Sequence, residues 1–171
     1  MDTPLHPNRV ANFFIEYSKE FNHNGIHPMS LNKLVYIANG WYWALFNKPL
    51  INEPIIAWKH GPIVPTVYYS FRYNGQHDDI EDGYIRESLD GYDVVVNSQT
   101  IAFLEKLYDA YREFTHTQLS TICHSKGTPW YNLSLEQNKK GFPKNFIIDD
   151  ALIREYYCQL ALKSGEQKPT E

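Results

Sequence analysis

Three residues in the second half of the chain, Ser120, Cys123 and His124, have side chains that could take part in a reaction. Ser120 and His124 are four residues apart, so on a helix they share one face and can touch. A hydrolase would use Ser120 or Cys123 as nucleophile and His124 as base. The sequence has no G-x-S-x-G motif and no identifiable group that would orient His124. We therefore expect no catalytic residues, and a small enzyme with a pocket around Trp58, His60 and His124 is the alternative.

Metal and cofactor chemistry can be weighed in the same way, because the chain has seven His and two Cys. His60, Cys123 and His124 are the candidate ligands. Adjacent residues such as Cys123 and His124 project about 100° apart on a helix, and nothing supplies the paired spacing of structural zinc sites. Glycine-rich loops that bind phosphate are also missing. We expect no metal and no cofactor, and the simpler role for His124 is to cap a helix C terminus or to hydrogen-bond a buried carbonyl.

Aromatic residues make up 15% of the chain and include 13 Tyr. A single Trp is more often part of a core than of a binding site. However, Trp41, Trp43, Tyr68 and Tyr69 occupy more directions than one core can absorb. We expect part of this aromatic surface to face a groove or a partner, where Tyr and Trp contribute strongly to binding.

A central helix over residues 30–46 is the element around which these residues must be arranged. Its apolar residues recur at helical spacing and nearly encircle the axis, which predicts a buried helix. Ser30 is the expected N-cap, and Pro28 is expected to end whatever precedes it.

A short extended segment is expected after the central helix. Over residues 55–60, the side chains of Ile56, Trp58 and His60 alternate with those of Ile55, Ala57 and Lys59, a period of two that is typical of a strand. We expect Gly61-Pro62 to prevent any further helix or strand pairing and to set a turn. Pro65 then starts a short helix that should end at Asn74-Gly75. Gly61 and Pro62 are thus predicted to be structural rather than reactive.

The remaining elements are predicted from caps and periodicity. A first helix should follow Pro7 with Asn8 as its cap, Ser98 should cap a further helix, and another helix should start at Thr115 or Thr117. Asp90-Gly91 predicts a small hairpin over residues 84–96. Residues 130–146 lack a period and are expected to form an irregular connection held by Trp130. A final helix should be capped by Asp149 or Asp150.

The expected fold class is therefore mainly α (α+β), with one compact helical domain around the central helix and a small β-hairpin. This domain should span residues 1–163, followed by a disordered tail at 164–171. The length of 171 residues suits one domain.

Charge and composition restrict the partners and the compartment. The formal net charge is −4, and the 16 Lys and Arg are scattered, which disfavours nucleic acid and suits a basic partner. Cys123 and Cys158 lie far apart, which predicts reduced thiols. Neither a signal peptide nor a membrane-spanning stretch is recognisable, so we expect a cytoplasmic protein with no membrane partner.

Several of these residues also form a pattern that resembles a known family. The core reads A-W-x-x-G-P-x-x-P over residues 57–65, and an L-S, H, P-W element follows over residues 119–130. The pattern is similar to the Panacea antitoxin domain, the SocA-like or phage-associated GepA-like family. Its matching positions are Lys33, Leu34, Tyr36, Ala38, Pro49, Leu50, Glu53, Ala57, Trp58, Gly61, Pro62, Pro65, Val67, Tyr68, Leu119, Ser120, His124, Pro129 and Trp130, with a weaker match at Ile148, Asp149, Ile153 and Tyr156.

This resemblance implies an antitoxin that neutralises a cognate toxin protein encoded nearby, in a family whose members bind unrelated toxin folds. It also associates the family with delivery of a toxin to a cellular protease. The extended segment 56–65 and its flanks then form the predicted partner-binding site, which consists of Lys33, Tyr36, Trp58, His60, Pro62, Tyr68 and Trp130. A transcriptional regulator is a further alternative, and a homo-oligomer is left open.

Overall fold

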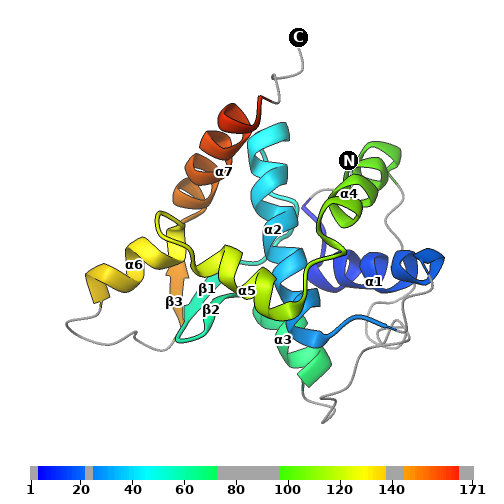
Figure 1. Cartoon of the computed structure of the whole chain (residues 1–171), viewed down its shortest axis with the longest axis horizontal. Helices are drawn as coiled ribbons and strands as arrows, with labels where there is room; N and C mark the ends of the chain where they lie inside the picture. Colours follow the sequence, from blue (N-terminus) through cyan, green and yellow to red (C-terminus); the bar gives the residue numbers. More distant parts are fainter. Residues whose placement is uncertain (1–3, 22–24, 73–96, 138–144, 166–171) are drawn as a thin grey trace.

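Helix α2 (Pro28–Phe46) runs through the middle of the molecule, as Figure 1 shows. The computed structural model describes residues 4–21, 25–72, 97–137 and 145–165. Every residue from 30 to 40 is buried, as is Tyr42. The helices that pack around α2 are α1 (Pro7–Ser18), α3 (Pro65–Arg72), α4 (Ser98–Tyr111), α5 (His116–His124) and α7 (Asp150–Ser164). The prediction of a buried central helix that touches the first and final helices is confirmed.

A small antiparallel sheet lies beside α2 and has the strand order β2-β1-β3. Its strands are β1 (Ile55–Trp58), β2 (Gly61–Ile63) and β3 (Phe146–Ile148). The predicted class, mainly helical with a little β-structure, is thereby confirmed. The expectation that Gly61-Pro62 ends the ladder is wrong, because Trp58 pairs with Gly61 and Ala57 with Pro62. Pro62 is tolerated because β2 is an edge strand, where a residue without N–H need not complete a ladder.

Buried polar residues of α2 hold the segment that follows it. The Asn32 amide donates to the Val64 carbonyl at 2.9 Å and accepts from the Val64 N–H at 3.1 Å. The Asn39 Oδ1 accepts from the N–H groups of Leu50 and Ile51. Because buried polar groups must be paired, these bonds fix the path of the chain from residue 50 to residue 64.

The helix ends differ from the prediction in which residue provides the cap. His6 and His27 cap α1 and α2 through Nδ1, which accepts from the backbone N–H two residues later, and each is followed by a proline. Asn8 and Ser30 are therefore inside their helices rather than at the caps. Helix α4 is capped by Asn97 rather than Ser98.

The predicted starts of two other helices are confirmed, each by the first of the two residues proposed. Thr115 caps α5 in a capping box with Gln118, and Asp149 caps α7. The predicted N1 position of Pro65 in α3 is also confirmed.

Residues 130–146 contain more regular structure than predicted. Helix α6 (Pro129–Gln137) starts directly at the proline, which is a favoured first helical residue, and β3 begins at Phe146. The irregular connection expected there is therefore wrong for these parts. A single 3₁₀ turn, η1 (Lys19–Phe21), extends α1.

Some predictions fall outside the described residues. They are the hairpin at 84–96, the helix end at Asn74-Gly75 and residues 166–171 of the tail. The limits of the domain at 1–163 stay a prediction. Among the helices that the structure describes, none has the length and apolar character needed to cross a membrane.

Candidate partner-binding site

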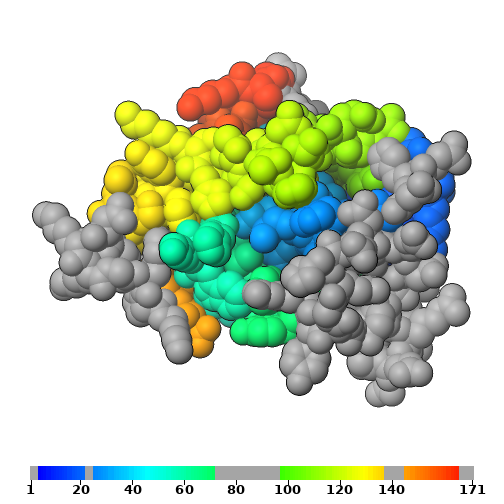
Figure 2. Space-filling view, turned by 60° about the horizontal axis from the view of Figure 1, so that its bottom comes forward, coloured from blue at the N-terminus to red at the C-terminus, as the bar shows by residue number. Residues whose placement is uncertain are grey.

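Four of the predicted site residues surround the turn between β1 and β2, and we call them the hairpin surface: Trp58, His60, Tyr68 and Trp130. His60 is exposed, and the other three are partly exposed. Figure 2 shows the β1–β2 segment at the surface between α5 and α3, beside the start of α2. The structure thus brings together residues from β1, the turn, α3 and α6.

Aromatic contacts and one hydrogen bond keep the hairpin surface in place. The indole N–H of Trp130 donates to the Trp58 carbonyl at 2.7 Å, so α6 is attached to the end of β1. The Trp58 and Tyr68 rings meet edge to face with centroids 4.7 Å apart. Tyr69, which was not among the predicted site residues, extends this surface and is 54% exposed.

The other three predicted site residues, Lys33, Tyr36 and Pro62, are buried. Lys33 is 0% exposed and Tyr36 is 1% exposed. Their side chains therefore offer no surface to a partner in this conformation. The Lys33 ammonium donates to the Pro62 carbonyl at 2.7 Å, whereas the Tyr36 ring meets the Tyr157 ring of α7 edge to face.

The turn itself depends on Gly61. Its φ of +111° is a conformation that residues with a Cβ rarely adopt. A Cβ at this position would lie 2.6 Å from His124 Nε2 and 2.8 Å from Lys33 Nζ. The two basic side chains therefore converge on the glycine, and the structural role predicted for Gly61 has a physical basis.

Burial changes the protonation of the residues around this turn. Burial lowers the pKa of Lys33 to about 8 and raises the pKa of the Cys123 thiol to about 12. The pKa of His124 is also lowered, first by burial and further by the nearby charge of Lys33. In each case desolvation disfavours the charged form.

The Ser120 and His124 side chains are not arranged as a nucleophile and its general base. Ser120 Oγ lies 3.3 Å from His124 Nδ1, but the Ser120 carbonyl oxygen lies closer, at 2.6 Å. A carbonyl only accepts, so Nδ1 must carry the proton and cannot take one from Ser120. The Cys123 thiol is buried and protonated at neutral pH, which removes it as a nucleophile. His124 thus bonds a backbone carbonyl, as its simpler role requires.

The candidate metal ligands are likewise not assembled. Within the described parts of the chain, no group of three or more His, Cys, Asp or Glu is placed to hold a metal ion.

Two neighbouring hollows open on either side of His60. The apolar hollow, of about 330 Å³, lies between the start of α2, the hairpin and α3. The histidine hollow, of about 590 Å³, lies between the hairpin, α5 and α6. Met29 and His60 line both of them. Sequence periodicity could not reveal these hollows, because they form where elements distant in the chain meet.

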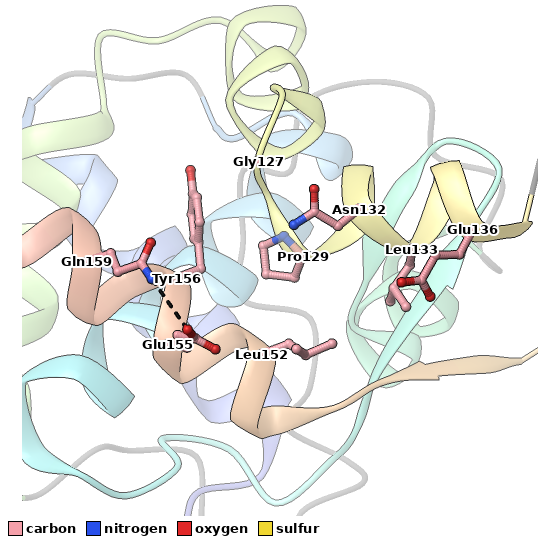
Figure 3. Close-up of a pocket in the computed structure, with 9 residues that line it drawn as sticks. All are labelled: Gly127, Pro129, Asn132, Leu133, Glu136, Leu152, Glu155, Tyr156 and Gln159. Atoms are coloured by element: carbon pink, nitrogen blue, oxygen red, sulfur yellow. Dashed lines mark hydrogen bonds between the residues drawn. The ribbon is translucent and has the colours of Figure 1, made fainter.

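A third cavity, of about 290 Å³, lies between α6 and α7 and is drawn in Figure 3. Glu136 from α6 and Glu155 from α7 line it, and Gln159 donates to Glu155 at 3.4 Å. The described residues that line this cavity include no Lys, Arg or His. Negative charge thus gathers at a site separate from the hairpin surface.

The comparisons with known proteins connect this arrangement with a class of proteins. The family model described as "Antitoxin SocA-like, Panacea domain" matches residues 31–131, from α2 through the start of α6. This range includes all four residues of the hairpin surface. The chain belongs to this family of SocA-like Panacea domains.

A curated relative agrees with this membership. Antitoxin SocA of Caulobacter vibrioides (strain NA1000 / CB15N) is 31% identical over 109 residues, which are 61% of this chain. The aligned part spans 58% of the length of that relative. No solved structure matches the chain.

Proposed function

We propose that this protein is an antitoxin that neutralises a cognate toxin, encoded by a neighbouring gene, by binding it directly through the hairpin surface. The observation that carries this proposal is a partly exposed group of aromatic residues around a hairpin that the Trp130 indole holds by a hydrogen bond. The chain that carries this group belongs to an antitoxin family. The geometry at Ser120, Cys123 and His124 gives no comparable support to an enzyme.

The physical basis is preorganisation. The hairpin is held by the Asn32 amide, the Lys33 ammonium and the Trp130 indole, so a partner would meet side chains that are already ordered. Binding to an ordered surface loses less conformational entropy than binding to a loop. Partly exposed Trp and Tyr side chains combine apolar area with a polar tip, which is typical of binding hot spots.

The seven predicted site residues then divide into two roles. Trp58, His60, Tyr68 and Trp130 make the contacts. The buried pair Lys33 and Pro62 supports the turn, so changes to these residues would weaken binding by altering the hairpin rather than by removing a contact. Tyr36 packs against Tyr157 and acts only through the core.

The first experiment expresses the protein together with the product of each adjacent gene. A neighbouring protein that arrests growth when expressed alone, is tolerated when co-expressed and purifies in complex with this chain would support the proposal. If no adjacent gene product is toxic or binds, the proposal fails.

The second experiment locates the site on the complex. His60→Ala combined with Tyr68→Ala should weaken toxin binding by about 1 to 3 kcal/mol, because both side chains reach the surface. Phe114→Ala removes an exposed aromatic side chain elsewhere and is the matched control. Titration and thermal melting are measured together. Unchanged affinity in a folded double variant would rule out the hairpin surface.

Delivery of the toxin to a protease is a finer mechanism within the same proposal. If binding alone neutralises, an equimolar amount of antitoxin protects cells without shortening the lifetime of the toxin. If the protein is an adaptor, the toxin lifetime shortens when antitoxin is present and recovers in cells that lack the protease.

A further inference from the structure

The hollows on either side of His60 are lined by basic groups. Lys59, His60, His116 and His124 line the histidine hollow, and His27 lines the apolar hollow beside it. Among the described lining residues of both hollows there is no Asp or Glu. This local surface therefore differs in sign from the whole chain, whose formal net charge is −4.

A buried cation lies directly behind this surface. Lys33 Nζ donates to the carbonyl oxygens of Pro62, at 2.7 Å, and His60, at 3.5 Å. Within the parts of the chain that the structure describes, Lys33 forms no ion pair with a carboxylate. Because the Lys33 side chain is 0% exposed, bulk solvent screens its charge only weakly, and the positive potential extends toward the turn.

The two hollows differ in what they can accommodate. The apolar hollow is walled by side chains such as Met29, Ile63, Val67 and Phe71, which suit an apolar group. The histidine hollow offers an ammonium, imidazoles and hydroxyl groups, which suit an anionic oxygen. Because the hollows share Met29 and His60, one short segment can reach both.

We propose that the hairpin surface binds a partner segment that combines an apolar side chain with a neighbouring Asp or Glu. The apolar side chain occupies the apolar hollow, and the carboxylate faces Lys59, His60 and His116 in the histidine hollow. This inference rests on the proposed function in taking the toxin as the natural partner, and it names the chemistry of the toxin segment that is bound. The net charge of the chain had suggested a basic partner, whereas the local charge selects an acidic one.

The first test uses displayed random peptides of about twelve residues, which are selected for binding to the full-length protein. Selected peptides should contain Asp or Glu close to Leu, Ile, Phe or Trp. Their affinity should fall as salt is raised, because the carboxylate contacts lie near the surface. Selection of basic or uncharged peptides, or of none, would overturn the proposal.

The second test reverses the charge of the histidine hollow. The double variant Lys59→Glu and His116→Glu should bind the selected peptides about tenfold or more weakly, because the peptide carboxylate would then meet like charge. Both side chains are exposed, so the fold should persist, and a thermal melt verifies this. Lys126→Glu reverses an exposed charge just beyond α5 that lines neither hollow, and it should change the affinity by less than about twofold.

The outcomes also separate this inference from the proposed function. In one outcome, the toxin binds the wild type and the charge-reversed variant equally well. This result would leave the antitoxin role intact and would overturn the proposal that the bound segment is acidic. Loss of the complex in that variant, with Lys126→Glu unaffected, supports both. Binding of selected peptides in the absence of any toxin among the neighbouring gene products would support the acidic segment and count against the antitoxin role.

Discussion

At the scale of single residues, the backbone around the hairpin is determined by a few buried polar side chains of α2. Asn32 bonds both backbone groups of Val64, Lys33 bonds Pro62, and Asn39 bonds Leu50 and Ile51. Each bond satisfies a polar group that would otherwise be buried without a partner. A helix that looks apolar by periodicity therefore also determines where the following strands lie.

Gly61 provides the first prediction at this scale. Gly61→Val should destabilise the fold by about 2 kcal/mol or more, because it combines an unfavourable positive φ with a clash against His124 and Lys33. Gly127→Val is the matched control, because its φ is +90° and a Cβ there meets nothing within 4 Å. Gly127→Val should lower the free energy of unfolding by only about 1 kcal/mol, the contribution of the unfavourable positive φ. Equal losses in chemical denaturation would show that the close approach at Gly61 does not matter.

Lys33 provides a prediction about pH. Its folded pKa of about 8 lies below the ordinary lysine pKa of 10.5, so between these values the unfolded chain binds more protons than the folded chain. Stability therefore rises with pH in this window, by on the order of 1 kcal/mol between about pH 7 and pH 9. The burial penalty on the charged lysine is fully present well below the folded pKa of about 8 and is relieved as the pH rises through it.

A lysine variant isolates this contribution. The pKa of Cys123 is raised from 9 to about 12, so that thiol acts in the opposite sense at higher pH, but it is present in both proteins. Lys33→Met should lower overall stability by removing the donor to Pro62, and it should flatten the rise between pH 7 and 9 relative to wild type. Lys126→Met, at an exposed lysine, should leave the rise unchanged. A wild-type slope that persists in Lys33→Met would contradict this explanation.

At the scale of elements, the sequence predicts helices better than their ends or the sheet. The apolar positions of α2 and the residues after Asp149 have a clear helical period, so these helices were predictable. The caps of α1 and α2 were missed because Ser and Asn are favoured over His as N-caps. The recurring pair His-Pro, at residues 6–7 and 27–28, is the signal that could have identified them.

The sheet and the site depend on contacts between distant residues, which explains why they were predicted less completely. β3 pairs with β1 across roughly ninety residues of chain, and three residues are too few to show a period of two. The predicted site residues come from β1, the turn, β2, α2, α3 and α6, and their exposure was not predictable. Whether Lys33 and Tyr36 face a partner or the core depends on where α5 and α7 pack.

The contact between α2 and α7 gives a prediction at this scale. Gly40 lies against the Tyr157 ring, and a Cβ there would come within 2.6 Å of Tyr157 Cζ. Gly40→Ala should destabilise the protein by about 1 to 3 kcal/mol, although alanine favours helix more than glycine does. Tyr157→Leu removes the clash but leaves a cavity. In a double-mutant cycle, the double variant should lose less stability than the sum of the losses of the two single variants. Strict additivity would mean that the contact is absent.

At the scale of the whole molecule, α2 connects the hairpin surface to the rest of the fold. Its first half supports the hairpin through Asn32 and Lys33, and further along Gly40 meets α7. The histidine hollow and the acidic cavity share helix α6, which lines the first with Trp130 and Tyr131 and the second with Leu133 and Glu136. The rigidity of the binding surface therefore depends on the stability of the core as a whole.

Hydrogen exchange provides the prediction that tests this dependence. The amides in the middle of α2 should be among the slowest to exchange, because helices and strands cover the helix on all sides and only unfolding of the core exposes it. Helix α7 buries only Ile153 and Tyr157 completely, so its amides should exchange faster through local opening. Measured as a function of denaturant, α2 should follow global unfolding. Exchange in α2 as fast as in α7 would mean that the hairpin is not supported by a stable central helix.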